Sequence, residues 1–80
     1  MLVKNRIKYY REKYNITQDE LAFQINKTKQ YISKLENHNI NIGIGVAINI
    51  TKALKNITTE KSFGLQTINI QVEDLFYIEK

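Results

Sequence analysis

The stretch TQDELAFQINKTKQYISKLEN, which spans residues 17–37, decides the fold. Its apolar residues recur at helical spacing in two short runs, which predict helices over residues 17–25 and 28–37. Thr17 and Glu20 have the spacing of a capping box, in which the two side chains bond to free backbone N–H groups at the start of a helix. The first of the two helices is therefore predicted to begin at Thr17.

The two predicted helices differ in how many apolar side chains they offer to a core. The inward-facing residues are Leu21, Ala22 and Ile25 in the first helix, and Ile32 and Leu35 in the second. Asn26 lies in the turn of about three residues between them, where a residue that tolerates a left-handed backbone is useful. This spacing is typical of a helix-turn-helix, and Thr28 is the expected N-cap of its second helix.

Residues 5–14 are predicted to form a helix ahead of this pair. Its inward face has the i, i+3, i+4, i+7 spacing and consists of Ile7, Tyr10, Arg11 and Tyr14. An arginine on such a face needs a partner for its charge. Asn15 follows the helix, and asparagine accepts the left-handed backbone that often ends one.

A fourth helix is predicted over residues 43–56, and its apolar residues are too widely spread for one face. One stripe consists of Ile44, Ala47, Ile48 and Leu54, and a neighbouring stripe consists of Val46, Ile50, Ala53 and Ile57. A chain this short is only marginally stable alone. We therefore expect one stripe to face the core and the stripe containing Val46 to form a homodimer interface.

The C-terminal segment is predicted to be mixed. Residues 57–72 do not have a helical pattern, and Ile68, Ile70 and Val72 alternate with polar residues as in a half-buried strand. Gly64 is expected to mark a turn, and 73–76 a short helical turn. We expect the tail, 76–78, to pair with the head, 2–3, as short strands.

Composition limits the class of protein. The chain has 80 residues, enough for one domain over 1–80, and no cysteine, which excludes disulfides and thiolate metal sites. Its 12 Lys and Arg exceed its 8 Asp and Glu, and the excess lies in the N-terminal half. No stretch resembles a signal peptide or a bilayer-spanning run, so we expect a cytoplasmic protein. Without a catalytic constellation, we expect neither enzyme activity nor a cofactor.

The segment NRIKYYREKYNITQDELAFQINKTKQYISKLENHN, residues 5–39, resembles the Xre-type (lambda repressor and Cro-like) helix-turn-helix family. The closing VEDLFYIEK resembles the last helix and tail of small members of it. The resemblance covers 4–56 and 72–79, and the ordered combination of Arg11, TQDELA, QYISKLEN and EDLF is specific. It implies an all-α, compact four- to five-helix DNA-binding domain. To this the pattern adds a short β element from residues 58–72 and the chain termini.

Several positions depart from the usual pattern of this family. Asn26 replaces the glycine usual between the second and third helices, and His38 replaces the glycine usual after LEN. The NPS that often opens the fourth helix is NIG here, at 41–43, and the segment 58–71 is longer than the usual link. Asparagine accepts a positive φ more readily than histidine does.

The resemblance implies roles for individual residues, because in this family the second helix of the motif lies in the major groove. The implied base-contacting residues are Thr28, Lys29, Gln30, Ser33 and Lys34. The implied phosphate-binding residues are Gln18, Lys27, Tyr31, Asn37, His38 and Asn39. Arg11 and Glu36 resemble the family's partly buried ion pair. Considered alone, the polar face of 28–37 is better interpreted as solvated surface, and the surrounding motif reverses that interpretation.

We therefore predict a sequence-specific double-stranded DNA-binding transcriptional regulator. It would act as a homodimer on a palindromic operator, and as a repressor, because a small protein can block polymerase access. The alternative is a protein-interaction module, antitoxin-like or a co-regulator, with 58–71 as its adaptable surface. His38 is a lone histidine, so no metal site is expected. No membrane or small-molecule partner is expected either.

Overall fold

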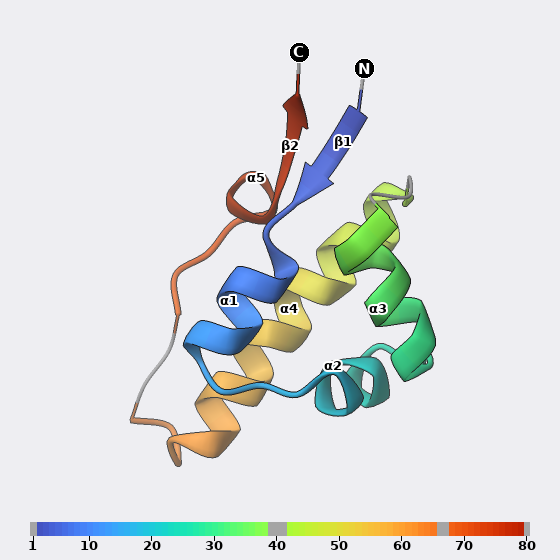
Figure 1. Cartoon of the computed structure of the whole chain (residues 1–80). Helices are drawn as coiled ribbons and strands as arrows, with labels where there is room; N and C mark the ends of the chain where they lie inside the picture. The colour runs from blue at the N-terminus through green and yellow to red at the C-terminus, as the bar shows by residue number, and fades with distance from the viewer. Residues whose placement is uncertain (1, 39–41, 66–67, 80) are drawn as a thin grey trace.

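The computed structural model describes residues 2–38, 42–65 and 68–79. The elements, in chain order, are β1 (Leu2–Asn5), α1 (Ile7–Lys13), α2 (Gln18–Gln24), α3 (Lys29–His38), α4 (Ile44–Lys61), α5 (Val72–Leu75) and β2 (Phe76–Glu79). Figure 1 shows the helices packed into one body, from which β1 and β2 project side by side. The expected mostly helical domain is confirmed, and so is the pairing of the chain ends.

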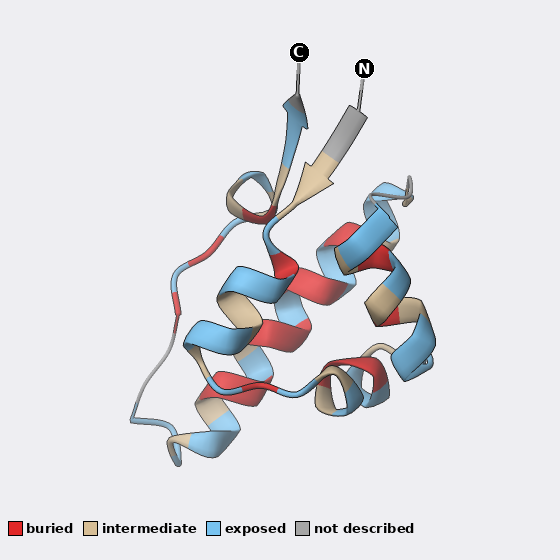
Figure 2. Ribbon diagram, viewed as in Figure 1, coloured by how far each residue is buried: buried red, intermediate tan, exposed pale blue. Residues whose placement is uncertain are grey.

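The core is built around α4, which passes behind α1 and reaches from the α3 side to the far end of the body (Figure 2). The fully buried side chains are Ile7, Ile16, Leu21, Ile32, Leu35, Ile50, Leu54 and Leu75. Removing such a side chain from water is worth about 1.5–3 kcal/mol, so these residues supply much of the drive to fold. Within the described segments, no helix combines the length and the apolar character needed to cross a membrane.

The start of the helix-turn-helix follows the sequence prediction closely. The backbone N–H of Glu20 donates to Thr17 Oγ1 at 3.0 Å, and the backbone N–H of Thr17 donates to Glu20 Oε1 at 2.9 Å. Asn15 and Asn26 have φ of 57° and 58°, the left-handed conformation expected at these two turns. Local residue chemistry therefore sets both boundaries of α2.

The first helix begins later than predicted. Asn5 is the last residue of β1, opposite Phe76 in the antiparallel register, and α1 starts at Ile7. The Asn5 side chain accepts from the backbone N–H of Ile7 at 3.2 Å and donates to the carbonyl of Leu35 at 2.7 Å. Asn5 thus joins the ribbon, the two-stranded sheet of β1 and β2, to α3 and does not extend α1.

The prediction that residues 57–61 are not helical is wrong, because α4 continues to Lys61. Ile57 and Thr58 are buried, and packing overrides the modest helix propensity of β-branched residues. The Thr58 hydroxyl donates to the carbonyl of Leu54 at 2.9 Å, so burying it leaves no unpaired donor. The helix ends where Phe63 and Gly64 adopt φ of 55° and 80°, and the Gly64 N–H donates to the carbonyl of Thr59 at 2.8 Å.

The strand predicted from Ile68 to Val72 is also wrong. Residues 68–71 belong to no helix or strand, and Val72 is the first residue of α5. The alternation nevertheless predicts burial correctly, since Ile68 and Ile70 are buried and Asn69 is exposed. Among the described residues, the sheet consists of β1 and β2 alone.

The two apolar stripes of α4 are not buried and exposed in the way that was predicted. Ile50, Ala53 and Ile57 are only 0, 3 and 4% exposed, because the face that carries them packs into the chain's own core. Val46 is half-buried against the same core. Ile50, Ala53 and Ile57 are therefore not on the surface, where the predicted homodimer interface would need them. Two residues assigned to the other stripe, Ile44 and Ile48, are 70% and 37% exposed.

Candidate nucleic-acid interface

The outer face of α3 carries polar side chains that the protein leaves uncommitted. Lys29, Gln30 and Lys34 are exposed, and none of the three side chains bonds to another residue in the described part of the chain. Ile32 and Leu35, on the opposite side of the helix, are completely buried. The helix is therefore anchored by two apolar side chains and presents free donors outward.

Two other predicted base-contacting residues also serve the structure of α3 itself. Thr28 Oγ1 accepts from the backbone N–H of Tyr31 at 3.1 Å, which caps the helix as expected. Ser33 is half-buried, and its hydroxyl accepts from Asn37 Nδ2 at 3.2 Å. The uncommitted donors of this face are consequently those of Lys29, Gln30 and Lys34.

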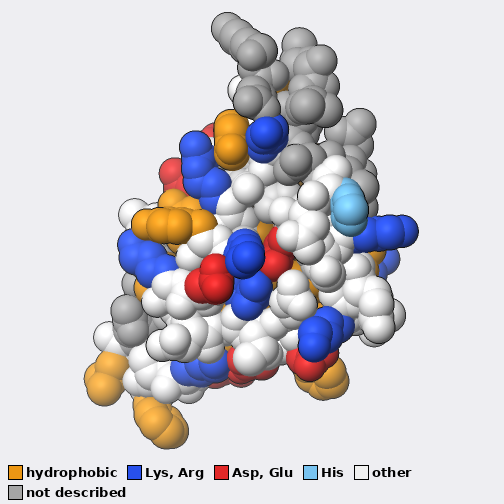
Figure 3. All heavy atoms as spheres, viewed as in Figure 1, with side chains coloured by type: hydrophobic (Ala, Val, Ile, Leu, Met, Phe, Trp, Pro, Cys, Tyr) orange, Lys and Arg blue, Asp and Glu red, His pale blue; other side chains and the backbone are white. Residues whose placement is uncertain are grey.

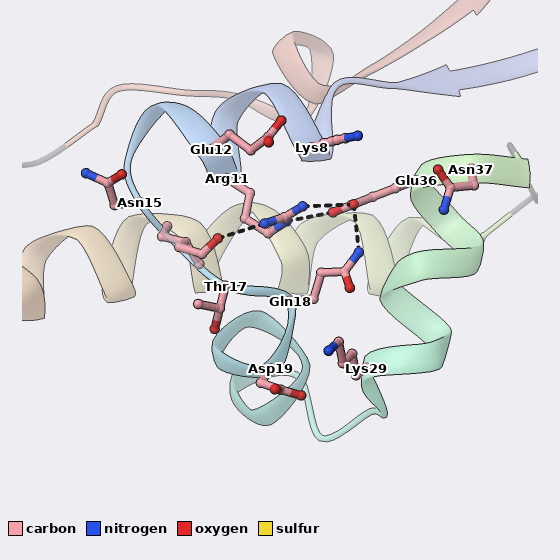
Figure 4. Close-up of a pocket in the computed structure, with 11 residues that line it drawn as sticks. Lys8, Arg11, Glu12, Asn15, Thr17, Gln18, Asp19, Lys29, Glu36 and Asn37 are labelled. Atoms are coloured by element: carbon pink, nitrogen blue, oxygen red, sulfur yellow. Dashed lines mark hydrogen bonds and ion pairs between the residues drawn. The ribbon is translucent and has the colours of Figure 1, made fainter.

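A groove of about 760 Å³ lies where α1, α2 and α3 meet, and Figure 4 shows its walls. An ion pair between Arg11 and Glu36 crosses it, with Arg11 Nε 2.8 Å from Glu36 Oε2 and Arg11 Nη2 3.1 Å from Oε1. The Gln18 amide nitrogen adds a third bond, donating to Glu36 Oε1 at 3.0 Å. Charged side chains of both signs gather over this region in the space-filling view (Figure 3).

The ion pair predicted between Arg11 and Glu36 is thus present, and it is well shielded from water. The two side chains are 12% and 1% exposed. The hydrogen bond to Glu36 raises the pKa of Arg11, although burial opposes the rise. Arg11 Nη1 also donates to the carbonyl of Ile16 at 3.0 Å. One carboxylate therefore holds side chains of α1 and α2 against α3.

Gln18, which the resemblance implies as a phosphate-binding residue, is the first residue of α2, and its side chain also bonds within the protein. Its amide nitrogen is turned toward Glu36 instead of being fully free. An amide NH₂ group carries two hydrogens, and Glu36 accepts one of them. One N–H of Gln18 is left to donate to a ligand in the groove.

The remaining predicted phosphate-binding residues lie near or at the ends of α3. Lys27 Nζ lies 5.4 Å from the centre of the Tyr31 ring, while Asn37 and His38 are exposed. His38 is the last residue of α3, one residue beyond the helix predicted over 28–37. Asn39 lies outside the described residues. No group of three or more His, Asp or Glu suited to a metal ion occurs in the described segments.

The sequence reasoning did not identify Lys8, which lines the groove together with Arg11. A pattern could have found it, because Lys8 precedes Arg11 by three residues and so shares its helix face. The bond from Gln18 to Glu36 had no comparable pattern, since it joins two helices across the turn.

Comparison with known proteins agrees with this arrangement. A family profile described as helix-turn-helix matches residues 7–61. An uncharacterized HTH-type transcriptional regulator of Methanocaldococcus jannaschii is 30% identical over 77 residues, which cover 96% of each chain. No solved structure gives a significant match to the chain. The matched range begins with α1 and ends with α4, so it contains every element that forms the groove.

Proposed function

The chain belongs to the helix-turn-helix family of DNA-binding domains, a non-enzymatic family, and we propose that it is a sequence-specific transcriptional regulator. It binds double-stranded DNA as a homodimer on a palindromic operator and represses transcription by blocking polymerase access. The proposal rests on the outer face of α3. Exposed hydrogen-bond donors there have no partner among the described residues, and buried apolar residues hold the helix in place.

The donors of α3 have the chemistry needed to distinguish bases in the major groove. A lysine ammonium donates to the O6 and N7 acceptors of guanine, and a glutamine amide pairs with N6 and N7 of adenine. Lys29, Gln30 and Lys34 therefore carry most of the base contacts, and Thr28 and Ser33 assist them. The Thr28 methyl group can contact a thymine methyl while its hydroxyl caps the helix.

Phosphate contacts hold α3 in register on the duplex without selecting its sequence. The free N–H of Gln18 and the amide of Asn37 supply them from the groove, and Lys27, Tyr31 and His38 supply them from the ends of the helix. The Arg11 charge offsets that of Glu36, which otherwise would repel a phosphate beside Gln18.

The homodimer needs an apolar surface other than the one first predicted. Ile44 and Ile48 stand one helical turn apart on α4 and are exposed, so they supply the hydrophobic contact between two copies. Ile44→Glu should shift the protein toward monomers in sedimentation while leaving its circular dichroism unchanged. A dimer that persists would exclude this placement.

A titration of promoter-region DNA at two salt concentrations, with unrelated DNA as competitor, tests the proposal. A regulator of this kind should prefer one palindrome, and its affinity should fall steeply as salt rises. Lys29→Ala or Gln30→Ala should cost about 1–3 kcal/mol on the operator and relax the preference at one base pair. Gln18→Ala should weaken binding to all sequences similarly. Equal loss on all sequences from both kinds of variant would refute this division of roles.

The alternative, a protein-interaction module, has one observation in its favour. Phe63 and Leu65, in the segment after α4, are each 91% exposed, and Phe23 on α2 is 84% exposed. Large apolar side chains in such positions are suited to a protein partner. Equal and weak binding to every duplex in the titration would favour this function over DNA recognition.

A further inference from the structure

Lys8 is a cationic residue whose charge has no partner among the described residues. It is exposed on α1, and its ammonium group forms no ion pair, hydrogen bond or aromatic contact with any residue of the described segments. Glu12 follows one turn later on the same helix, at a spacing that often allows an ion pair, yet the two do not pair. The charge of Lys8 is therefore available to a ligand.

The position of Lys8 places that charge in the groove. Lys8, Gln18 and Asn37 all line it, and they come from α1, α2 and α3 respectively. In Figure 4 the Lys8 side chain extends toward the Glu36 and Asn37 side of the groove and away from Glu12. Three groups with N–H donors thus border one opening, each on a different helix.

The charges around the opening favour an anion at the Lys8 end. Glu36 is paired with Arg11, so its carboxylate does not oppose an anion at full strength. The unpaired acidic groups that line the groove are Glu12 and Asp19, and Figure 4 shows Asp19 beside α2, on the side away from Lys8. Lys8 and Lys29 are the lysines that line it.

We infer that Lys8 binds a backbone phosphate of DNA in this groove. Together with the free N–H of Gln18 and the amide of Asn37, it makes a phosphate site to which each helix of the groove contributes one donor. The inference rests on the proposed function and deepens it, because it assigns α1 a direct part in DNA binding. In this arrangement α1 binds the sugar-phosphate backbone of the DNA, while α3 contacts the bases.

The salt dependence of binding tests this inference, because each phosphate contact adds about 0.9 to the slope of log affinity against log salt. The proposed homodimer carries two copies of Lys8, so Lys8→Gln should reduce the slope by about 1.8, on the operator and on unrelated duplex alike. Between 50 and 200 mM salt, the affinity of the variant should fall roughly 12-fold less than that of the unchanged protein. Base preference should stay the same.

Lys13→Gln is the matched control. Lys13 lies on the same helix, and its substitution by glutamine removes the same charge. Its Nζ lies 5.8 and 5.6 Å from the centres of the Tyr9 and Tyr14 rings, and Lys13 does not line the groove. It should change the slope much less than Lys8→Gln does. Lys8→Arg should keep the original slope, and Glu12→Gln should strengthen binding, since it removes a negative charge from the groove.

Two results would overturn the inference. Equal slopes for Lys8→Gln and Lys13→Gln would mean that only net charge matters, and an unchanged slope for Lys8→Gln would mean that Lys8 contacts no phosphate. Failure of the unchanged protein to prefer any operator is a different result, since it would reject the proposed function and the inference with it.

Discussion

Two ion pairs in this molecule have nearly the same length and very different surroundings. Arg11 and Glu36 approach to 2.8 Å with side chains 12% and 1% exposed. Lys61 and Glu20 approach to 2.9 Å with side chains 39% and 36% exposed. The first pair joins α1 to α3 inside the groove, and the second joins the end of α4 to the start of α2 at the surface.

The difference shows that burial, and not distance, decides what each pair does. Water screens the exposed pair, and such pairs contribute about 0–1 kcal/mol. The buried pair has lost most of its water, so each charge depends on the other. The attraction between the two charges offsets the cost of removing them from water, so the net contribution of the intact pair to stability is smaller than the loss when one partner is removed.

Breaking the buried pair on one side should have the largest effect. Arg11→Met leaves the Glu36 carboxylate buried with only the Gln18 amide as a donor, and should destabilise the fold by about 3–5 kcal/mol. Urea unfolding followed by circular dichroism measures this loss. DNA affinity should fall as well, measured in conditions where the variant is folded, because Glu36 would then repel a phosphate beside Gln18.

The double variant Arg11→Met, Glu36→Leu sharpens the test. Replacing both charges by apolar groups removes the unpaired carboxylate, so the double variant should be more stable than Arg11→Met alone. If the two substitutions simply added, the buried pair would be no more coupled than a surface pair.

The exposed pair should respond much less. Lys61→Met removes the bond to Glu20 and the bond that Lys61 Nζ donates to the carbonyl of Asn15. We expect a loss of about 1 kcal/mol or less in the free energy of unfolding, and a smaller difference from the unchanged protein at high salt. A loss as large as that of Arg11→Met would refute the contrast between the pairs.

Acid should reveal the smallest effect, at Glu20. The backbone N–H of Thr17, with help from Lys61, holds the pKa of Glu20 below its usual range. The stabilisation from Glu20 is therefore complete above its unfolded pKa of about 4.3, and it is lost as pH falls through the lower folded pKa. Unfolding measured between pH 5 and 3 should show a shallower decline for Glu20→Gln. The same slope in both proteins would contradict this assignment.

The sequence predicts best where one residue type answers one local requirement. The position of Arg11 on an apolar face indicated a partner for its charge, and the spacing of Thr17 and Glu20 predicted the start of α2. Asn15 and Asn26 indicated the turns, because asparagine tolerates the backbone that those turns need. Each of these predictions depended on a few neighbouring residues.

Prediction failed where distant packing made the decision. Ile57 and Thr58 have no local preference strong enough to extend α4, and their burial supplies the reason. Both stripes of α4 are apolar, so the sequence alone does not decide which of them is buried. The packing of α4 against the other helices buries Ile50 and leaves Ile44 exposed. For the same reason, Gln18 could not be assigned to Glu36 before the helices were placed.

The ribbon of β1 and β2 also has a consequence for the order in which the protein folds. Gln18 and Glu36 are 18 positions apart in the chain, whereas Arg6 Nη1 donates to the carbonyl of Asp74 across 68 positions. Closing the longer loop costs more chain entropy, and α1 and α4 must first bring the ends near each other. We therefore expect the two-stranded sheet to be the last part to assemble and the first to open. In native-state hydrogen exchange, its amides should lose protection before those of α2 and α3.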